Sequence, residues 1–354
     1  MPISPGSSVD LTEALAAQVR AASSSATPLR IQGSGTRAFY GREVVGQALD
    51  MIGHRGVIDY DPSEMVITAR SGTPMTEIEA LLDTQNQMLA FEPPSFGPDG
   101  TLGGAVATGL SGPRRPFTGA LRDYVLGARI LDGRGEVLRF GGTVFKNVAG
   151  FDAFRLMAGA QGCLGAILEV SLRVVPRPRV ETSLAFQKTG PDAQHWLLGL
   201  MRRPLPLSGA FHDGECLYVR LSGGESAVAV TARELGGEVE DPAIWRSIAN
   251  VTHPALDGSP VLWRLALPQA ATPLELAEVP WDCGGGVRWL RADGVDPAIW
   301  ALAARCNGHA TIWRGSRDKV FQPLAPPIFE LHKRIKAALD PAGIFNPGRM
   351  YEGL

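Results

Sequence analysis

Three glycine-rich segments contain the residue types best suited to hold a phosphate-bearing or flat ligand. The first is Ile31-Gln32-Gly33-Ser34-Gly35-Thr36-Arg37, where a short predicted strand runs into a turn with two glycines. Glycine adopts positive φ and leaves no side chain in the way, so successive N–H groups can converge on an anion. The hydroxyls of Ser34 and Thr36 can add donors. The turn therefore suits a pyrophosphate, and the alternative is an ordinary strand-ending turn.

The second segment is Gly97-Pro98-Asp99-Gly100-Thr101-Leu102-Gly103-Gly104-Ala105-Val106-Ala107-Thr108-Gly109. Its small residues allow a flat or extended ligand to lie against the backbone, most closely at Gly103 and Gly104. We expect residues 97–120 to form a long loop, and a loop of this length inside a compact domain is usually functional. The alternative is a loop-to-helix junction packed against a sheet.

The third segment is Gly159-Ala160-Gln161-Gly162-Cys163-Leu164-Gly165-Ala166-Ile167-Leu168-Glu169. Three of its glycines precede the longest apolar strand pattern in the chain. A turn at this point can place backbone N–H and C=O groups on the polar edge of a flat ring. A helix C-cap followed by a turn is the alternative interpretation.

A nicotinamide-binding turn of the G-x-G-x-x-G type fits the first segment less well. Ala38 stands where the third glycine belongs, and no helical pattern follows directly. Metal chemistry is not predicted either, because none of the six histidines pairs with another at the spacing of metal ligands. These histidines are His54, His195, His212, His253, His309 and His332. Arg314 is a candidate anchor for a carboxylate through bidentate hydrogen bonds, with a surface ion pair as the alternative.

The hydrophobic pattern predicts an α+β fold around these segments. In the first half we expect a helix over 11–22, a helix capped by Thr73 with Pro74 at its first position, and strands over 28–32, 56–60, 65–69, 124–131, 136–140 and 166–175. Further on we expect strands over 217–221 and 261–267 and helices around 196–200, 299–305 and 328–339, while 227–235 fits either type. Pro176-Arg177-Pro178 is the best candidate for a domain boundary.

Composition narrows the class of protein. The 354 residues are enough for two domains, and 45% hydrophobic with 20% charged residues is typical of globular cores. The net charge of −2 argues against nucleic acid as a partner. No apolar run reaches the length of a membrane span, and the N-terminus lacks a signal-peptide pattern. The cysteines form no C-x-x-C motif, so the sequence favours the cytoplasm; they are Cys163, Cys216, Cys283 and Cys306.

The three segments in this order, with the Asp132-Gly133-Arg134-Gly135-Glu136 hairpin before the third, resemble the PCMH-type FAD-binding domain of the vanillyl-alcohol oxidase superfamily. The resemblance covers roughly residues 1–178. Residues 339–349 resemble the chain end of the D-2-hydroxyacid dehydrogenase branch. The family implies a two-subdomain FAD-binding domain over 1–178, a smaller α+β cap domain over 179–322, and a C-terminal segment, 323–354, that returns to the first domain. It implies contacts with FAD from Gly33, Ser34, Gly35, Thr36, Pro98, Thr101, Gly103, Gly104, Thr108, Gly162, Gly165, Ile167 and Asn346.

Residues 143–152, 309–314 and 320–324 resemble, more narrowly, the FAD-binding subunits of bacterial glycolate oxidases. That resemblance implies an FAD-dependent oxidoreductase acting on a small 2-hydroxy acid, with glycolate oxidised to glyoxylate. It also implies a larger FAD subunit and an iron–sulfur subunit as partners, at the inner face of the membrane through those partners. His309 lies in the matched region and is the second catalytic candidate. The alternative is a structural or electron-relay subunit that binds FAD without catalysis.

Two departures from the wider family refine these expectations. Many members attach FAD covalently through a histidine in the first loop, but Ser34-Gly35-Thr36-Arg37 contains none, so we predict non-covalent FAD. The larger catalytic members also carry a histidine-rich metal and substrate segment that this chain lacks. Catalysis is therefore expected to need the larger subunit.

Overall fold

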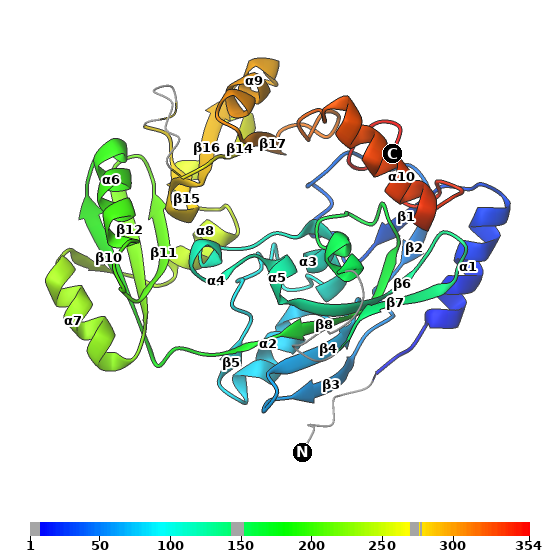
Figure 1. Ribbon diagram of the computed structural model, residues 1–354, viewed down its shortest axis with the longest axis horizontal. Coiled ribbons are helices and arrows are strands. Elements are labelled where there is room, and N and C mark those ends of the chain that lie inside the picture. The colour runs from blue at the N-terminus through cyan, green and yellow to red at the C-terminus, as the bar shows by residue number, and fades with distance from the viewer. Residues whose placement is uncertain (1–7, 143–151, 270–275, 277) are drawn as a thin grey trace.

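The structure is a computed structural model that describes residues 8–142, 152–269, 276 and 278–354. Two sheets form its N-terminal half (Figure 1). The smaller sheet pairs β1 (Leu29–Gln32) in parallel with β2 (Gln47–Asp50), and α1 (Thr12–Ser24) packs against it. The larger is antiparallel in the order β3-β4-β8-β6-β7. Its strands are β3 (Val57–Asp61), β4 (Val66–Arg70), β6 (Val125–Leu131), β7 (Val137–Gly141) and β8 (Ala166–Arg173).

The central strand of the larger sheet is β8, in which Glu169, Ser171 and Arg173 alternate with apolar residues. It lies between β4 and β6, and its residues are buried except at the C-terminal end. On one face α2 (Met75–Asp83) and α3 (Leu102–Thr108) cover the sheet with apolar side chains. Ile167, Val170 and Leu172 of β8 belong to this core, so apolar residues recur along the strand. The predicted strands and the β6–β7 hairpin are confirmed in this half.

An eight-stranded sheet dominates the C-terminal half, in the order β13-β10-β12-β11-β15-β16-β14-β17. The strands are β10 (Val180–Gln187), β11 (Leu207–His212), β12 (Cys216–Gly223), β13 (Glu238–Glu240), β14 (Val261–Ala266), β15 (Trp281–Asp282), β16 (Val287–Ala292) and β17 (His309–Arg314). A two-stranded ribbon of β5 (Gln87–Met88) and β9 (Val175–Pro176) precedes it.

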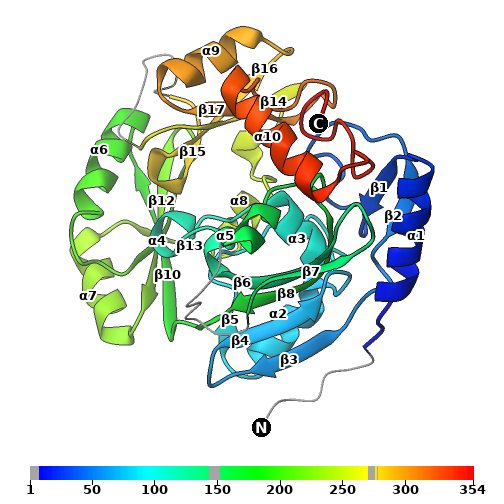
Figure 2. The same ribbon diagram turned by 45° about the vertical axis from the view of Figure 1, so that its right-hand side comes forward.

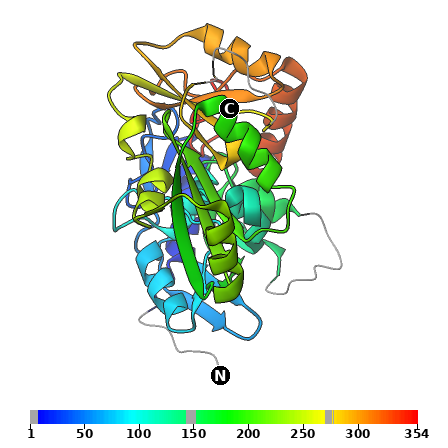
Figure 3. The same ribbon diagram turned by 90° about the vertical axis from the view of Figure 1, so that its left-hand side faces the viewer.

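The two faces of this sheet have different partners. Outer helices α6 (Gly190–Leu200), α7 (Glu225–Leu235) and α9 (Pro297–Arg305) pack on one face, and Figure 3 views the molecule from the side where α6 and α7 lie. The other face packs with α8 (Ile244–Ala249) against aromatic side chains of the N-terminal half, including Tyr40. This eight-stranded sheet, called the cap sheet below, therefore packs directly on the segment that follows the first glycine turn. No helix in the described part of the chain is long and apolar enough to cross a membrane.

Three local expectations need correction or completion. Residues 97–120 are not one loop, because Thr101 accepts a hydrogen bond from the N–H of Gly104 and caps α3; α4 (Arg115–Thr118) and α5 (Leu121–Tyr124) follow. Thr73 does not cap α2, since its hydroxyl accepts the N–H of Gly56 instead. Residues 227–235, which fitted either type, belong to α7.

The chain end returns to the first half after α10 (Pro326–Leu339), beside β1 in Figure 2. The N–H of Leu29 donates to Ile344 and the N–H of Asn346 donates to Leu29, so the tail runs along β1. A buried ion pair anchors the turn into this tail: Lys336 Nζ lies 2.9 Å from the carboxylate of Asp340. The C-terminal tail therefore belongs to the same layer as the first glycine turn.

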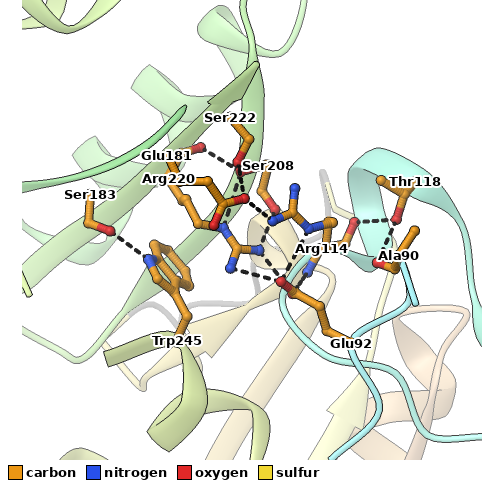
Figure 4. A network of polar contacts seen from close by, with 10 residues as sticks. All are labelled: Ala90, Glu92, Arg114, Thr118, Glu181, Ser183, Ser208, Arg220, Ser222 and Trp245. Carbon is orange, nitrogen blue, oxygen red and sulfur yellow. Dashed lines mark hydrogen bonds and ion pairs between the residues drawn. The ribbon is translucent and has the colours of Figure 1, made fainter. Parts of the chain in front are cut away.

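A cluster of charges around two buried arginines joins the two halves (Figure 4). Glu92, from the N-terminal half, accepts hydrogen bonds from Arg114 and from Arg220 on β12. Arg114 also pairs with Glu181 on β10, and the Arg220 guanidinium lies over the ring of Trp245. Both arginines are almost fully buried. Each has carboxylate partners, which a buried cation requires.

Replacing Glu181 with glutamine is expected to lower the melting temperature at neutral pH by about 2–4 °C. Burial disfavours the ionised carboxylate, but Arg114 and the hydrogen bonds from Arg114 and Ser222 outweigh it and lower the pKa of Glu181. A carboxyl group with a lowered folded-state pKa stabilises the protein above its unfolded-state pKa of about 4.3. That contribution is lost as the pH falls through the lower folded-state value.

Thermal unfolding of both proteins from neutral pH down to ~pH 3 checks this, since the two curves should converge in acid. Glu234→Gln is the control, because its partner Arg203 and Glu234 itself are about half exposed. A deficit in melting temperature that stays constant across the pH range would contradict the role given to Glu181.

Candidate functional site

A cavity of about 310 Å³ opens beside the first glycine turn. It lies between β1, α3, the third glycine segment and the C-terminal tail. The predicted residues on its wall are Gly33, Ser34, Gly35, Thr36, Thr101, Gly104, Thr108 and Asn346. Gly35 has a φ of 79°, a conformation that glycine adopts without strain. The tertiary fold thus brings parts of all three glycine segments to one cavity.

A smaller cavity of about 80 Å³ adjoins the first and shares part of its wall, including Gly33, Thr101 and Asn346. It adds the remaining predicted positions on this side, Gly103, Gly162, Gly165 and Ile167. All predicted cofactor positions except Pro98 therefore line these two adjoining cavities. Pro98 lines a separate cavity of about 760 Å³ beside α2, because Gly97, at a φ of 114°, turns the chain before it.

Glycine is required where the three segments meet. A Cβ atom on Gly33 would lie 2.7 Å from Thr101 Oγ1, and one on Gly103 would lie 2.7 Å from Cβ of Ser71. Gly162 has a φ of 74°, and a Cβ there would lie 2.6 Å from Asn346 Nδ2. Larger residues would push the segments apart or fill the space between them. The small residues therefore set the shape of this groove, as a ligand lying against backbone requires.

The larger cavity is positively charged. Arg30, Arg37, Arg317 and Arg349 line it together with a single acidic residue, Glu43. Within the residues that the structure describes, no ion pair involves any of these four arginines. Uncompensated guanidinium groups beside a glycine turn form a suitable site for phosphate groups.

Arg37 is the arginine with donors to spare. It is 6% exposed, and its Nη2 donates to the carbonyl of Pro94 at 2.5 Å. Its Nε is buried and has no acceptor among the described residues. Burial lowers the pKa of Arg37 to about 10, so the group stays charged at neutral pH. A buried cation with an unused N–H at a cavity wall can bind an anionic ligand.

The inner face of the cap sheet approaches the same region. Tyr40 and Phe39, just after the glycine turn, make ring contacts with Trp313 on β17. Arg264, in the middle of β14, is opposite Thr311 in register. Its guanidinium makes no hydrogen bond or ion pair to another described residue. Arg264 is therefore a second available cation, on the cap side of the boundary between the halves.

The two catalytic candidates differ in how the fold uses them. Arg314 donates to the carbonyl of Leu256 at 2.9 Å and to Asp257 at 3.1 Å, so protein groups already occupy its guanidinium. His309 begins β17 and is exposed. Partial loss of solvation, with Arg264 and Arg115 nearby, lowers the pKa of its imidazole. The lowered pKa favours the neutral imidazole, which has a ring nitrogen available to accept a hydrogen bond, whereas the guanidinium of Arg314 is already held by protein groups.

None of the described residues that line the two glycine-segment cavities is a histidine or a cysteine. His54 is fully buried elsewhere, where it accepts the N–H of Leu11, and burial lowers its pKa to about 4. Across the described ranges, no three side chains of the metal-binding types come together. Residues 143–151, part of the narrower resemblance, lie outside the described residues.

Sequence reasoning missed the side chains that supply charge and hold the loops. Arg37 directly follows the first turn, Gln161 lies inside the third segment, and Arg349 ends the C-terminal motif. Arg264 is the single charged residue in an otherwise apolar strand, and this pattern could have marked it as a functional candidate. Arg37, Gln161 and Arg349 lie within or beside the motifs, but the residues that they contact are distant in sequence.

Comparison with known proteins gives the same assignment for both ends of the chain. The family described as "FAD binding domain" matches residues 8–141, and "FAD linked oxidases, C-terminal domain" matches residues 312–350. The fold is similar to that of an alkyldihydroxyacetonephosphate synthase, with a TM-score of 0.66 at 15% identity over 95% of this chain and 75% of that one. At that identity, the likeness concerns the fold alone.

Two relatives are subunits of glycolate oxidases. The glycolate oxidase subunit GlcD of Bacillus subtilis is 27% identical over 60% of this chain and 47% of its own. The glycolate oxidase subunit GlcE of Escherichia coli is 46% identical over 346 residues, which cover 98% of this chain and 99% of the relative. The chain therefore belongs to the FAD-linked oxidase family, in the group that includes the glycolate oxidase subunit GlcE.

Proposed function

We propose that this protein is the FAD-binding subunit of a glycolate oxidase complex. It takes part in the oxidation of glycolate, or a related D-2-hydroxy acid, to the 2-oxo acid, with electrons passed to an iron–sulfur subunit. The observation that carries the proposal is the glycine-walled cavity with four arginines that form no ion pair with another described residue. The near full-length similarity to a GlcE subunit supports the same activity and the same kind of partners.

The proposed placement of FAD follows from charge and space. The turn at residues 33–36 and the spare donors of Arg37 would hold the pyrophosphate. The narrow adjoining cavity, walled by Gly162, Gly165 and Ile167, would take a flat portion of the cofactor. When bound, FAD supplies an acceptor for the two electrons and the hydrogen of the substrate C–H bond. The chain itself supplies binding, orientation and fixed positive charge.

The proposed substrate contact is on the cap side of the site. Arg264 would bind the carboxylate of a 2-hydroxy acid, since the described residues give its guanidinium no direct ion pair but an electrostatic interaction with the buried Asp282. His309 would accept the hydroxyl proton or orient the substrate, since loss of solvation, with a smaller effect from Arg264 and Arg115, lowers its pKa and favours the neutral imidazole. Arg314 is the weaker candidate, because Asp257 holds it.

We further propose that FAD is held without a covalent bond. Covalent attachment to these cavities would need a nucleophilic side chain on their walls, and neither histidine nor cysteine lines them in the part of the chain that the structure describes. Acid precipitation of the holoprotein is therefore expected to release all of the flavin into the supernatant. Yellow colour that remains with the denatured pellet would contradict this.

The second candidate function is a structural or electron-relay subunit that binds FAD but has no substrate site. The absence of a metal-binding cluster among the described residues is the observation that favours it. Anaerobic addition of glycolate to the isolated, FAD-loaded chain separates the two. Bleaching of the flavin absorption without partners supports catalysis by this chain and rules out the second function.

The experiment that tests the main proposal is purification of the chain alone and with its partners. Tight FAD binding, a flavin absorption spectrum and copurification with a larger FAD subunit and an iron–sulfur subunit are the expected results. A colourless protein that gains no flavin spectrum when FAD is added overturns the proposal.

A further inference from the structure

The guanidinium of Arg349, in the C-terminal tail, is surrounded by acceptors from two distant segments. Its Nε donates to the side-chain oxygen of Gln161 at 3.1 Å. Its two terminal nitrogens donate to a row of backbone carbonyls just after the first glycine turn. These are the carbonyls of Arg42 at 2.6 Å, Tyr40 at 2.7 Å, Ala38 at 3.2 and 3.3 Å, and Arg37 at 3.4 Å.

This set of contacts leaves Arg349 no donor for a ligand. A guanidinium has five N–H groups, one on Nε and two on each terminal nitrogen. Here Nε has one acceptor, and each terminal nitrogen has two or more. Arg37, on the same cavity wall, has an unused Nε instead. The two arginines therefore differ in kind: Arg37 can contact an anion, and Arg349 can only act through the segments that it holds.

The two segments that Arg349 joins both line the cavity, one through Arg37 and Ala38 and the other through Gln161. Residues 37–42 continue from the glycine turn and contain no helix or strand. The N–H of Tyr40 donates to Arg37 within the segment, and the N–H of Ala38 donates back to Gly35 in the turn. Gln161, with a φ of 51°, lies in the third glycine segment. The backbone completes the link, because the N–H of Arg42 donates to the carbonyl of Arg349 at 2.9 Å.

Asn346 makes a second connection to the third glycine segment, this time from β1. Its side-chain oxygen accepts the N–H of Ile31 at 2.8 Å, and its amide donates to the carbonyl of Gln161 at 2.6 Å. The tail thus ties β1 to the third glycine segment at one point and the loop after the turn to Gln161 at another. Asn346 is itself buried between the segments that it connects.

We propose that Arg349 is a positioning residue for cofactor binding, which holds the loop at residues 37–42 against the third glycine segment so that the pyrophosphate cradle exists before FAD arrives. The inference rests on the proposed FAD-binding function and adds to it a residue that does not contact the cofactor. A loop with few bonds of its own loses entropy when it is ordered by a ligand, and a prior restraint removes that cost from binding.

The test compares Arg349→Ala and Arg349→Lys with the control Arg317→Ala in the full chain. Arg317 lines the same cavity and donates to the same Ala38 carbonyl, but through a single exposed contact of 3.3 Å. Replacing Arg317 therefore removes the same positive charge as replacing Arg349, but only one hydrogen bond to the loop. FAD affinity is measured by titration of the apoprotein, the stability of each apoprotein by thermal unfolding, and the environment of bound FAD by visible circular dichroism.

Both Arg349 variants are expected to bind FAD about tenfold more weakly or worse, with an altered visible dichroism of bound FAD. Arg317→Ala is expected to lose only about threefold, as for an exposed charge. The lysine variant keeps the charge but cannot reach five acceptors in one plane, so it should not restore binding. Its apoprotein should melt close to the wild-type temperature.

Wild-type affinity in Arg349→Lys, or equal losses in Arg349→Ala and Arg317→Ala, would show that charge alone matters and would overturn the proposal. A lysine variant whose melting temperature falls in step with its affinity would also overturn it, because the role would then be structural. If Arg349→Ala does not fold, Arg349→Lys decides by itself. If the wild-type protein itself binds no FAD, the proposed FAD-binding function fails, which is distinguishable from failure of the role given to Arg349.

Discussion

Replacing Gly33 with valine is expected to weaken FAD binding about 100-fold or more. The first added carbon would lie 2.7 Å from Thr101 Oγ1, closer than real Cβ atoms approach. Thr101 caps α3 through the N–H of Gly104, so its displacement disturbs the second glycine segment as well as the first. The two remaining methyl groups of valine would occupy space in a groove that both cavities share.

Equilibrium titration of the apoprotein with FAD, followed by protein fluorescence, measures this loss. Gly199→Val is the matched control, because Gly199 lies on α6, far along the chain, and an added Cβ there meets nothing within 4 Å. The control should bind FAD like the wild type. If Gly33→Val binds FAD normally while remaining folded, the cofactor lies elsewhere, and the assignment of the cavity fails.

Replacing Asp340 with alanine is expected to destabilise the fold by about 3–5 kcal/mol. Its carboxylate is 1% exposed and accepts hydrogen bonds from Lys336 and from the N–H groups of Ile344 and Phe345. Lys336 is itself buried and would keep only two carbonyl partners, those of Cys163 and Phe345. A buried ammonium without its counter-charge is strongly unfavourable, so the tail beside β1 should detach.

The same helix offers an exposed pair for comparison. Lys333 lies 3.0 Å from Glu330, and both side chains are largely open to solvent. Glu330→Ala should cost no more than about 1 kcal/mol, because exposed pairs contribute little. Denaturant unfolding of the two variants beside the wild type gives both values. Similar small losses for Asp340→Ala and Glu330→Ala would mean that the buried pair does not anchor the tail.

The strands and the hairpin were predictable because their signals are local. β8 carries Glu169, Ser171 and Arg173 at every second position among apolar residues, and β6 and β7 flank a turn of Asp132, Gly133, Arg134 and Gly135. The hydrophobic periodicity of a strand and the residue types of a turn depend on neighbouring positions only. No distant contact is therefore needed to interpret them. α3 was missed because Gly103 and Gly104 are poor helix formers, and the cap from Thr101 together with burial of Leu102 and Val106 outweighs that preference.

The sheet of the second half could not be derived in the same way. Its order places β15 between β11 and β16 and places β17 beside β14, pairings between segments far apart in the chain. Short strands such as β13 and β15 carry too few residues for a periodic pattern. Only the tertiary arrangement decides which of them pair, because each is stable through its neighbours rather than through its own sequence.

For the site, the sequence by itself determined the three glycine segments, their order and the kind of cofactor that they favour, since glycine's freedom to turn and its lack of a side chain are local properties. Only the tertiary structure decided that Gly33, Thr101, Gly162 and Asn346 share one groove, while Pro98 lies outside it. It also decided the roles of the arginines. Whether a guanidinium is free to bind or already engaged depends on acceptors from distant segments, and no pattern of neighbouring residues encodes that.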